Sequence, residues 1–313
     1  MVTLVASLAC LLLALPAFAA FDWTDENGAL RLSWDGQPVL QYNYETVEPP
    51  EGVGDAFARN AYLHPVWSPT GQIVTDDFPA DHYHQRGIFL AWTKTEFGDL
   101  HPDFWNLGSL TGRIICEQVE SKDADAAGAT LVTKHLWQAR RGEAWVPVLR
   151  ETWTIRVHAP TAADADCWTM DLTSRQECAT DTPLVLPVYF YGGFAYRGAR
   201  AWLEQRDLAW ALTSEGKARQ SADRTTGKWC VMGGPLGDGW GGATVMDHPG
   251  NLRHPNWLRV HPSIPYFGYM LPQAEAFTFE PGKEHLFRYR ILVHSSQPTA
   301  EQLEALWQEY RGT

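Results

Sequence analysis

The chain has 313 residues, of which 45% are hydrophobic and 20% are charged, a composition that excludes an intrinsically disordered protein. Its formal net charge of -12 at pH 7 repels phosphate backbones and anionic membrane surfaces, so we expect no nucleic-acid partner. The 15 Trp, 11 Tyr and 13 Phe favour β-strands and are also typical of clefts that bind sugars.

The first 20 residues form an apolar run that ends in Ala17-Phe18-Ala19, the small-x-small pattern that signal peptidase recognises. We therefore expect residues 1–20 to be a signal peptide and the protein to be periplasmic or secreted. The run has no Lys or Arg before its apolar stretch, and retention as a membrane anchor is the alternative. The mature chain has no further spanning segment.

Short stretches of β-forming residues then alternate with turn residues almost to the end of the chain. Residues 29–44 predict a hairpin with Asp35-Gly36 at its turn. Further strands are predicted at 112–121, 129–140, 146–159 and 167–178. In the third of these, Trp153, Ile155 and Val157 fall on one face, which indicates a strand with one buried side.

Near the C-terminus, residues 277–294 predict a late hairpin with Pro281-Gly282 at the turn. Helical periodicity is clear only at 297–312, where Thr299 can cap the helix and Gly312 ends it. No repeat or linker marks a domain boundary. We therefore expect residues 21–313 to form a single all-β domain, a large antiparallel β-sandwich of the supersandwich kind seen in aldose epimerases.

Four cysteines follow the predicted leader: Cys116, Cys167, Cys178 and Cys230. An oxidising compartment permits disulfides, and the sequence does not choose between the three pairings of four cysteines. Buried free thiols are an equal alternative.

The first polar window is DFPADHYHQRGIFLAW, residues 77–92. If its middle part is extended, His82, His84 and Arg86 point to the same side, because side chains alternate along a strand. The apolar stretch that follows predicts a buried strand, so these three residues should stand where a sheet meets a cleft.

The second window, residues 246–262, is rich in Pro and Asn and predicts an irregular loop that carries His248, Arg253, His254, Arg259 and His261. Imidazoles transfer protons near neutral pH, and guanidinium groups stabilise negative charge. We predict that the two windows meet although more than 150 residues separate them. The expected pocket is lined by His84, Arg86, His248, Arg253 and His254, with Trp92, Trp105 or Trp257 on its wall.

Within this pocket we assign His84 and His254 as the acid/base pair, and Arg86 and Arg253 as the groups that stabilise negative charge. Glycines, aromatic rings and charged side chains in other stretches add candidates for substrate binding. These candidates are His82, Trp92, Trp105, Tyr196, Arg197, Glu215, Lys217, His248, Trp257 and His261.

No cofactor is required by this chemistry. A divalent transition metal is the alternative, because His82 and His84 would supply two ligands on one face and His248, His254 or His261 a third. Arg86 beside the pair would repel a cation, which favours metal-free acid/base chemistry.

The stretches HPVWSPTGQIVTDDFPADHYHQRGIFLAW, YGGFAYRG, TSEGKAR and DHPGNLRHPNWLRVHP resemble the bacterial family labelled PmoA-like, over about Leu63 to His294. That family has two adjacent histidines before the Arg-Gly of the first motif, and Gln85 stands at the second of these positions here. The resemblance implies a soluble or exported protein associated with sugar catabolism. It implies no established catalytic residues.

The leading hypothesis is an exported carbohydrate-active enzyme, a lyase, hydrolase or epimerase, that acts on a sugar or an oxidised sugar by His/Arg acid-base chemistry. One alternative is a non-catalytic carbohydrate-binding protein of the cell envelope. A third hypothesis is a partner that docks other proteins, which would require an exposed apolar patch in place of a polar pocket.

Overall fold

The computed structural model describes residues 19–161 and 166–313. The predicted signal peptide lies outside the described residues except for its last two, so its cleavage and the export of the protein stay predictions. Among the described residues, no helix has the length and hydropathy needed to cross a membrane.

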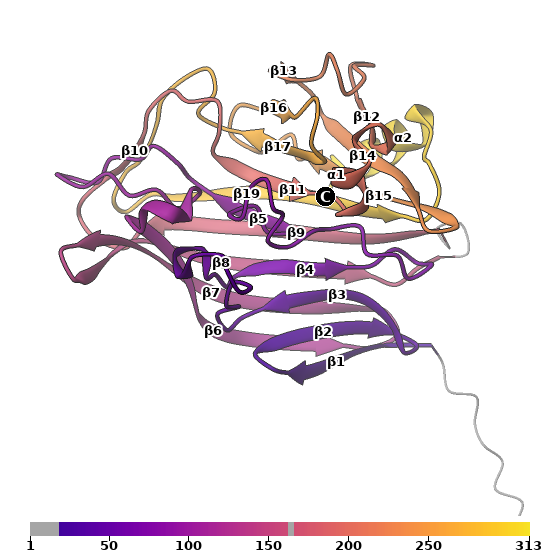
Figure 1. Cartoon of the computed structure of the whole chain (residues 1–313), viewed down its shortest axis with the longest axis horizontal. Coiled ribbons are helices and arrows are strands. Elements are labelled where there is room, and N and C mark those ends of the chain that lie inside the picture. Colours follow the sequence, from indigo (N-terminus) through magenta and orange to yellow (C-terminus); the bar gives the residue numbers. More distant parts are fainter. Residues whose placement is uncertain (1–18, 162–165) are drawn as a thin grey trace, which may run out of the picture.

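Two large antiparallel sheets face each other across one hydrophobic core, which confirms the predicted β-sandwich (Figure 1). The first sheet has nine strands in the spatial order β1-β2-β3-β4-β5-β11-β17-β16-β13. Their bounds are β1 Phe21–Glu26, β2 Ala29–Trp34, β3 Gln37–Asn43, β4 Tyr62–Val66, β5 Ile88–Ala91, β11 Gly193–Arg197, β17 Tyr266–Met270, β16 Trp257–Val260 and β13 Thr225–Thr226.

The second sheet has eight strands in the order β12-β14-β15-β19-β9-β8-β7-β6, and β10 and β18 form a separate pair. The bounds are β12 Trp210–Thr213, β14 Trp229–Leu236, β15 Gly239–Asp247, β19 Glu284–His294, β9 Cys167–Cys178, β8 Ala144–His158, β7 Gly128–Arg141, β6 Gly112–Ala124, β10 Leu184–Leu186 and β18 Phe277–Phe279. The helices are α1 Ala201–Glu204, α2 Ala300–Tyr310, and the 3-10 turns η1 Asp55–Phe57, η2 Leu107–Ser109 and η3 Arg206–Leu208.

Local sequence signals account for several elements. Asp35 and Gly36 both have positive φ angles, 49° and 78°, which is the backbone of the tight turn predicted between β2 and β3. Helix α2 begins at the predicted cap, where Thr299 and Gln302 form a reciprocal capping box. Its apolar face packs on the outer side of the second sheet through a satellite core that includes Leu303 and Trp307.

The prediction that residues 277–294 form a hairpin is wrong. Strands β18 and β19 do flank the Pro281-Gly282 turn, but β18 pairs with β10. Strand β19 already has β9 on one edge and β15 on the other, so neither edge is left for β18.

Of the two predictions for the cysteines, disulfides or free thiols, the structure supports free thiols. Cys116, Cys178 and Cys230 are free, and the Cys178 thiol donates to the carbonyl of Phe279 at 3.1 Å. Cys167 and Cys178 lie at opposite ends of β9, too far apart for a disulfide.

A buried carboxylate ties together three strands of the second sheet. Glu151, 2% exposed, accepts hydrogen bonds from the side chains of His135, Trp137, Trp153, Ser174 and Gln176. These donors outweigh burial, which alone would raise the pKa of Glu151, and hold that pKa below its ordinary value. The sandwich interior is therefore not wholly apolar.

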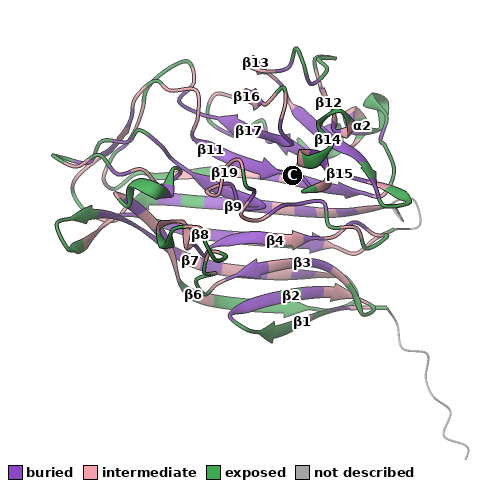
Figure 2. Ribbon diagram, viewed as in Figure 1, coloured by how far each residue is buried: buried purple, intermediate pink, exposed green. Residues whose placement is uncertain are grey.

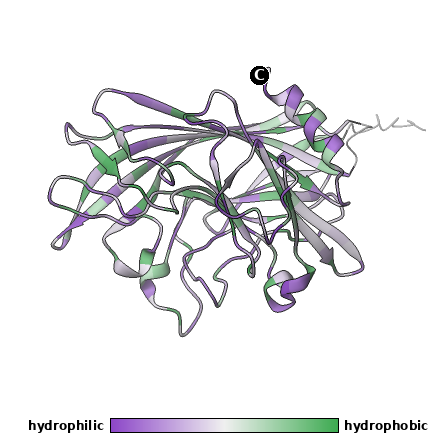
Figure 3. Cartoon of the chain, turned by 90° about the horizontal axis from the view of Figure 1, so that it is seen from above, coloured by the Kyte–Doolittle hydropathy of each residue, from purple (hydrophilic) through white to green (hydrophobic). Residues whose placement is uncertain are grey.

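The nine-stranded sheet is covered on both faces at its centre. Every residue of β5, β11 and β17 is buried, whereas the edge strand β1 is largely exposed (Figure 2). The second sheet covers one face, and long connecting loops cover the other. Figure 3 shows these loops gathered on the side of the molecule away from the C-terminal helix. We call the covered outer side of the nine-stranded sheet the loop face.

Glu151→Ala should lower the free energy of unfolding by about 3–5 kcal/mol, because it leaves several buried donors without an acceptor. The exposed neighbour Glu177→Ala is the matched control and should change it by less than about 0.5 kcal/mol. Urea unfolding measures both. Equal effects of the two substitutions would contradict the role of Glu151.

Buried histidines should make the fold acid-sensitive. Burial lowers the pKa of His294 to about 3, from an ordinary value near 6.5. Below about pH 6.5 the unfolded chain takes up a proton that the folded chain refuses, so the free energy of unfolding must fall as the pH decreases toward 3. His294→Gln should flatten this dependence between pH 7 and pH 5, and the exposed His101→Gln should not. Identical slopes in all three proteins would rule out the contribution of His294.

Candidate functional site

The first window folds as a turn and not as an extended segment. The N–H of Gln85 bonds to the carbonyl of His82 at 2.9 Å, which reverses the chain before β5. The prediction that His82, His84 and Arg86 share one strand face is therefore wrong. The two imidazoles still touch edge to face, with ring centroids 5.5 Å apart.

Arg86 points into the protein and is fully buried. Its guanidinium forms an ion pair with Asp77, donates to the hydroxyl of Tyr62 at 2.6 Å and to the carbonyl of Phe57 at 3.0 Å, and lies over the ring of Phe78. All its polar atoms are thus engaged. We correct the predicted catalytic role of Arg86, which fixes the turn in place.

Asp81 links the turn to the sheet beneath it. Arg197, at the end of β11, donates to both carboxylate oxygens of Asp81 at 2.8 and 3.2 Å and to Gln85 at 2.8 Å. Asp81 in turn lies 3.0 Å from Nδ1 of His82. Burial acts to raise the pKa of Asp81, but the hydrogen bonds from His82 and Arg197 outweigh it and hold that pKa well below its usual range.

This chain of contacts sets the tautomer of His82. Because the Asp81 carboxylate can only accept, Nδ1 of His82 carries the hydrogen and Nε2 of the neutral ring keeps its lone pair. The His82 side chain is 35% exposed, so solvent or a ligand can approach it. An imidazole oriented by a partly buried carboxylate is the arrangement of a general base.

His261, from the second window, joins His82 on the loop face. Its Nδ1 accepts from the backbone N–H groups of Ser263 and Ile264, both at 3.2 Å, so its hydrogen lies on Nε2. Burial and the charges of Arg259 and His82 lower the pKa of His261 to about 4. His82 and His261 therefore present opposite hydrogen-bonding characters, an acceptor and a donor.

His84 completes this set, and burial followed by the charge of His82 lowers its pKa to about 4. It is neutral at pH 7. We call Asp81, His82, His84, Arg197 and His261 the loop-face cluster.

Aromatic side chains gather at Arg259, two residues before His261 of the loop-face cluster. Tyr191 accepts a hydrogen bond from Arg259 at 3.2 Å, and its ring lies 5.6 Å from that of Trp105 and 6.1 Å from that of Tyr266. Arg259 also forms an ion pair with Asp223 at 2.6 Å. The roles of Asp81, Tyr191 and Asp223 escaped the sequence analysis, although Asp81 stands directly before the His-x-His pattern.

Two cavities share Val188 and Tyr189 in their walls. One of about 560 Å³ is lined by polar side chains, including His101 and Asp103, together with Tyr189. The other, of about 410 Å³, has Tyr189, Phe190, Trp257 and Arg224 in its wall. Trp257 therefore lies where a bound ligand could reach it.

Other predicted binding residues lie elsewhere. Trp92 is buried between the sheets, where it donates to Gln176 at 2.8 Å, and Tyr196 is buried and donates to the carbonyl of Val74. Both belong to the core, and their predicted contact with a ligand is wrong. Glu215 and Lys217 are exposed in the loop after β12.

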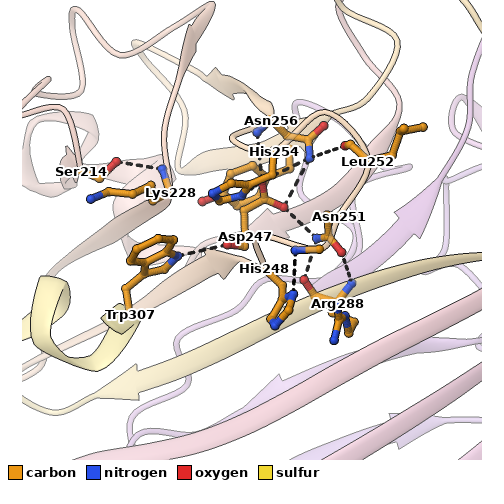
Figure 4. A network of polar contacts seen from close by, with 12 residues as sticks. Ser214, Lys228, Asp247, His248, Asn251, Leu252, His254, Asn256, Arg288 and Trp307 are labelled. Atoms are coloured by element: carbon orange, nitrogen blue, oxygen red, sulfur yellow. Dashed lines mark hydrogen bonds and ion pairs between the residues drawn. The ribbon is translucent and has the colours of Figure 1, made fainter. Parts of the chain in front are cut away.

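A second histidine network surrounds Asp247 at the end of β15 (Figure 4). The buried carboxylate of Asp247 is 2.9 Å from Nδ1 of His254 and accepts from the side chains of Asn251 and Asn256. Its backbone carbonyl accepts from the indole of Trp307 in α2, and the ring of Trp307 is stacked on His254. All but one of these bonds fall within residues 247–256, so the network shapes this loop and docks α2.

His248 and Arg253 belong to contacts of their own. Nδ1 of His248 accepts from the N–H of Gly250, and its ring packs edge to face on Tyr310 of α2. Arg253 donates to the carbonyls of Leu271 and Glu275.

The prediction that His84, Arg86, His248, Arg253 and His254 line one pocket is consequently wrong. Among residues 19–161 and 166–313, no hydrogen bond or ring contact joins His84 to His254, the predicted acid/base pair. The two windows approach each other at His82 and His261, since the charge of His82, after burial and Arg259, helps to lower the pKa of His261.

In the part of the chain that the structure describes, no three His, Cys, Asp or Glu side chains converge as a metal site requires. Metal binding stays a prediction that assays with and without a chelator would test.

No curated protein matches the chain. Among solved structures it is similar to the heparan sulfate lyase HepC from Pedobacter heparinus, with 7% identity, a TM-score of 0.37, and coverage of 90% of this chain and 36% of that one. A protein from the human microbiome described as a kojibiose phosphorylase has 9% identity and a TM-score of 0.28, with 73% and 30% covered. The chain thus spans about a third of the length of these proteins.

A family model matches residues 29–308, which include the loop-face cluster and every strand of the two sheets except β1. It neither supports nor opposes the resemblance to the PmoA-like family. With a match over most of its length, the chain belongs to the family of unknown function DUF6807.

Proposed function

We propose that the protein is a carbohydrate-active enzyme whose site is the loop-face cluster. The observation that carries this proposal is the relay from Arg197 through Asp81 to His82, which leaves the Nε2 lone pair of a partly exposed imidazole free to take a proton. His261, with its hydrogen on Nε2, would donate to the oxygen on which negative charge develops. This pair replaces His84 and His254.

The surroundings favour a sugar as the substrate. Aromatic rings offer flat apolar faces to sugar rings, and nearby polar groups bind hydroxyls. Two cavities large enough for monosaccharide units have Tyr189 in their walls, and one of them also has Trp257 and Arg224. The ring of Tyr189 lies 6.3 Å from that of Tyr191, which accepts a hydrogen bond from Arg259, two residues before His261.

The geometry favours proton transfer at a sugar carbon, as in an epimerase or lyase, over glycoside hydrolysis. Most glycoside hydrolases need two carboxyl groups that flank the scissile bond. Here Asp81 is bound by Arg197, Asp223 is paired with Arg259, and Asp103 accepts from two side chains and two backbone N–H groups. The imidazoles are the groups left to move protons.

Export to the periplasm or the medium is part of the proposal. It rests on the apolar leader of the sequence, residues 1–20, and secretion of a tagged full-length chain would test it.

His82→Ala should lower kcat on a sugar substrate by on the order of 10²-fold or more, because it removes the proposed base. His158→Ala is the matched control, since His158 is also paired with a carboxylate, Asp171 at 2.7 Å, but lies on the second sheet. A screen of monosaccharides, disaccharides and their keto forms supplies the substrate. Full turnover by His82→Ala would exclude this mechanism. Sugar binding without turnover by the wild type would instead support a non-catalytic binding protein.

Asp81→Asn tests the positioning of His82 separately. The amide can donate to Nδ1 and so favours the tautomer with hydrogen on Nε2, which blocks the base. We expect kcat to fall on the order of 10²-fold with KM little changed. A change in KM alone would show that Asp81 serves only to bind substrate.

A further inference from the structure

Arg59 is a buried cation without a hydrogen-bond partner. The residue is 4% exposed, and its three guanidinium nitrogens are each buried and unpaired among the described residues. The guanidinium lies over the ring of Phe89 in β5, with 4.7 Å from the guanidinium carbon to the ring centroid. By contrast, the neighbouring Arg86 has a partner for every nitrogen.

An unpaired buried guanidinium is unfavourable, because the charge loses its hydration and gains no anion in return. Burial, followed by repulsion from Arg86, lowers the pKa of Arg59 to about 9, so the group stays charged at neutral pH. The negative charges of Glu151 and Asp77 act on it only from a distance. Folded proteins normally pair such groups, and the missing partner of Arg59 therefore calls for an explanation.

Arg59 lies beside the loop-face cluster. Its charge is one of those that depress the pKa of His84, and Phe89, on which it lies, packs against Trp105 at 4.9 Å. Within the cluster, Nε of Arg197 is also buried and has no partner in the described part of the chain. Arg59 therefore adds, beside the loop-face cluster, a positive charge for which the described residues supply no hydrogen-bonding anion.

We propose that Arg59 binds the carboxylate of an acidic sugar, and that uronates are the substrate class of this site. This inference rests on the proposed function. A planar carboxylate matches the fork of a guanidinium through two parallel hydrogen bonds. It also carries a single charge, which suits a protein whose net charge of -12 disfavours multiply charged anions.

A ligand reaches the enclosed guanidinium only if a covering loop moves. Phe57 of η1 packs edge to face on Tyr83, with centroids 5.6 Å apart, and so holds the turn at His82 and His84 against the segment that leads to Arg59.

Calorimetric titration of the mature protein tests the proposal. D-glucuronate and D-galacturonate are compared with D-glucose and D-galactose, and glucose 6-sulfate tests for an anion other than a carboxylate. The wild type should bind at least one uronate on the order of tenfold or more tighter than its neutral counterpart. Arg59→Met should reduce this ratio to about one. The exposed Arg156→Met, on β8, should leave it unchanged.

Thermal unfolding without sugar separates ligand binding from a purely structural role of Arg59. If Arg59 only stabilised the fold, Arg59→Met would lower Tm. Arg59→Met removes an unpaired buried charge, so Tm should stay constant or rise. Should this variant fail to fold, Arg59→Lys keeps the charge without the fork and should lose most of the uronate preference.

Three results would overturn the proposal: equal uronate preference in Arg59→Met and the wild type, tighter binding of the sulfate ester than of any uronate, or a lower Tm of Arg59→Met with its preference intact. Binding of neutral sugars alone would be consistent with the proposed function but would contradict this inference. Binding of no sugar at all would contradict both the proposed function and this inference.

Discussion

The ion pair between Arg197 and Asp81 is the constraint on which the loop face depends. Arg197 ends a central strand of the nine-stranded sheet and is fully buried, so its charge must be met by an anion from outside the sheet. Asp81 meets it, and the turn that carries Asp81 is thereby folded over the sheet. Gly87 allows the chain to enter β5 from this turn: its φ is +52°, and a Cβ there would collide with the carbonyl of Leu63.

The same pairing of histidine with a carboxylate serves different ends in this protein. His135 and Glu151 are wholly buried and hold strands together, whereas Asp247 and His254 shape a loop that supports α2. The pair of Asp81 and His82 combines a fixed tautomer and an exposed ring edge with a place on the loop face, next to Arg197. Chemical type alone therefore does not identify the site. Burial and the use of the second imidazole nitrogen distinguish a structural pair from a candidate base.

Local patterns in the sequence were enough to predict the sandwich. Alternation in ETWTIRV, the Asp35-Gly36 turn and the Thr299 cap each depend on a few neighbouring residues, and each was confirmed. Strand pairing between distant segments could not be predicted in this way, which is why β18 was assigned to the wrong neighbour.

Predictions of the site failed where side-chain direction depended on tertiary packing. The expected strand geometry at His82 was replaced by a turn because Asp81 and Gln85 both bind Arg197, a residue more than 100 positions away. Tryptophans gave no signal that separates core from cleft: Trp92 bonds to the interior Gln176, whereas Trp257 borders a cavity. The unpaired state of Arg59 likewise appears only when every neighbour is in place.

The central claim is that a sugar binds at His82 and His261. Long-range proton–nitrogen NMR of the imidazole rings tests it most directly, because it reports the tautomer of each histidine and its response to a ligand. The account predicts a hydrogen on Nδ1 of His82 and on Nε2 of His261, and nitrogen shifts at both when a sugar is added, with His254 and His158 unchanged. Shifts at His254 with none at His82 or His261 would contradict it.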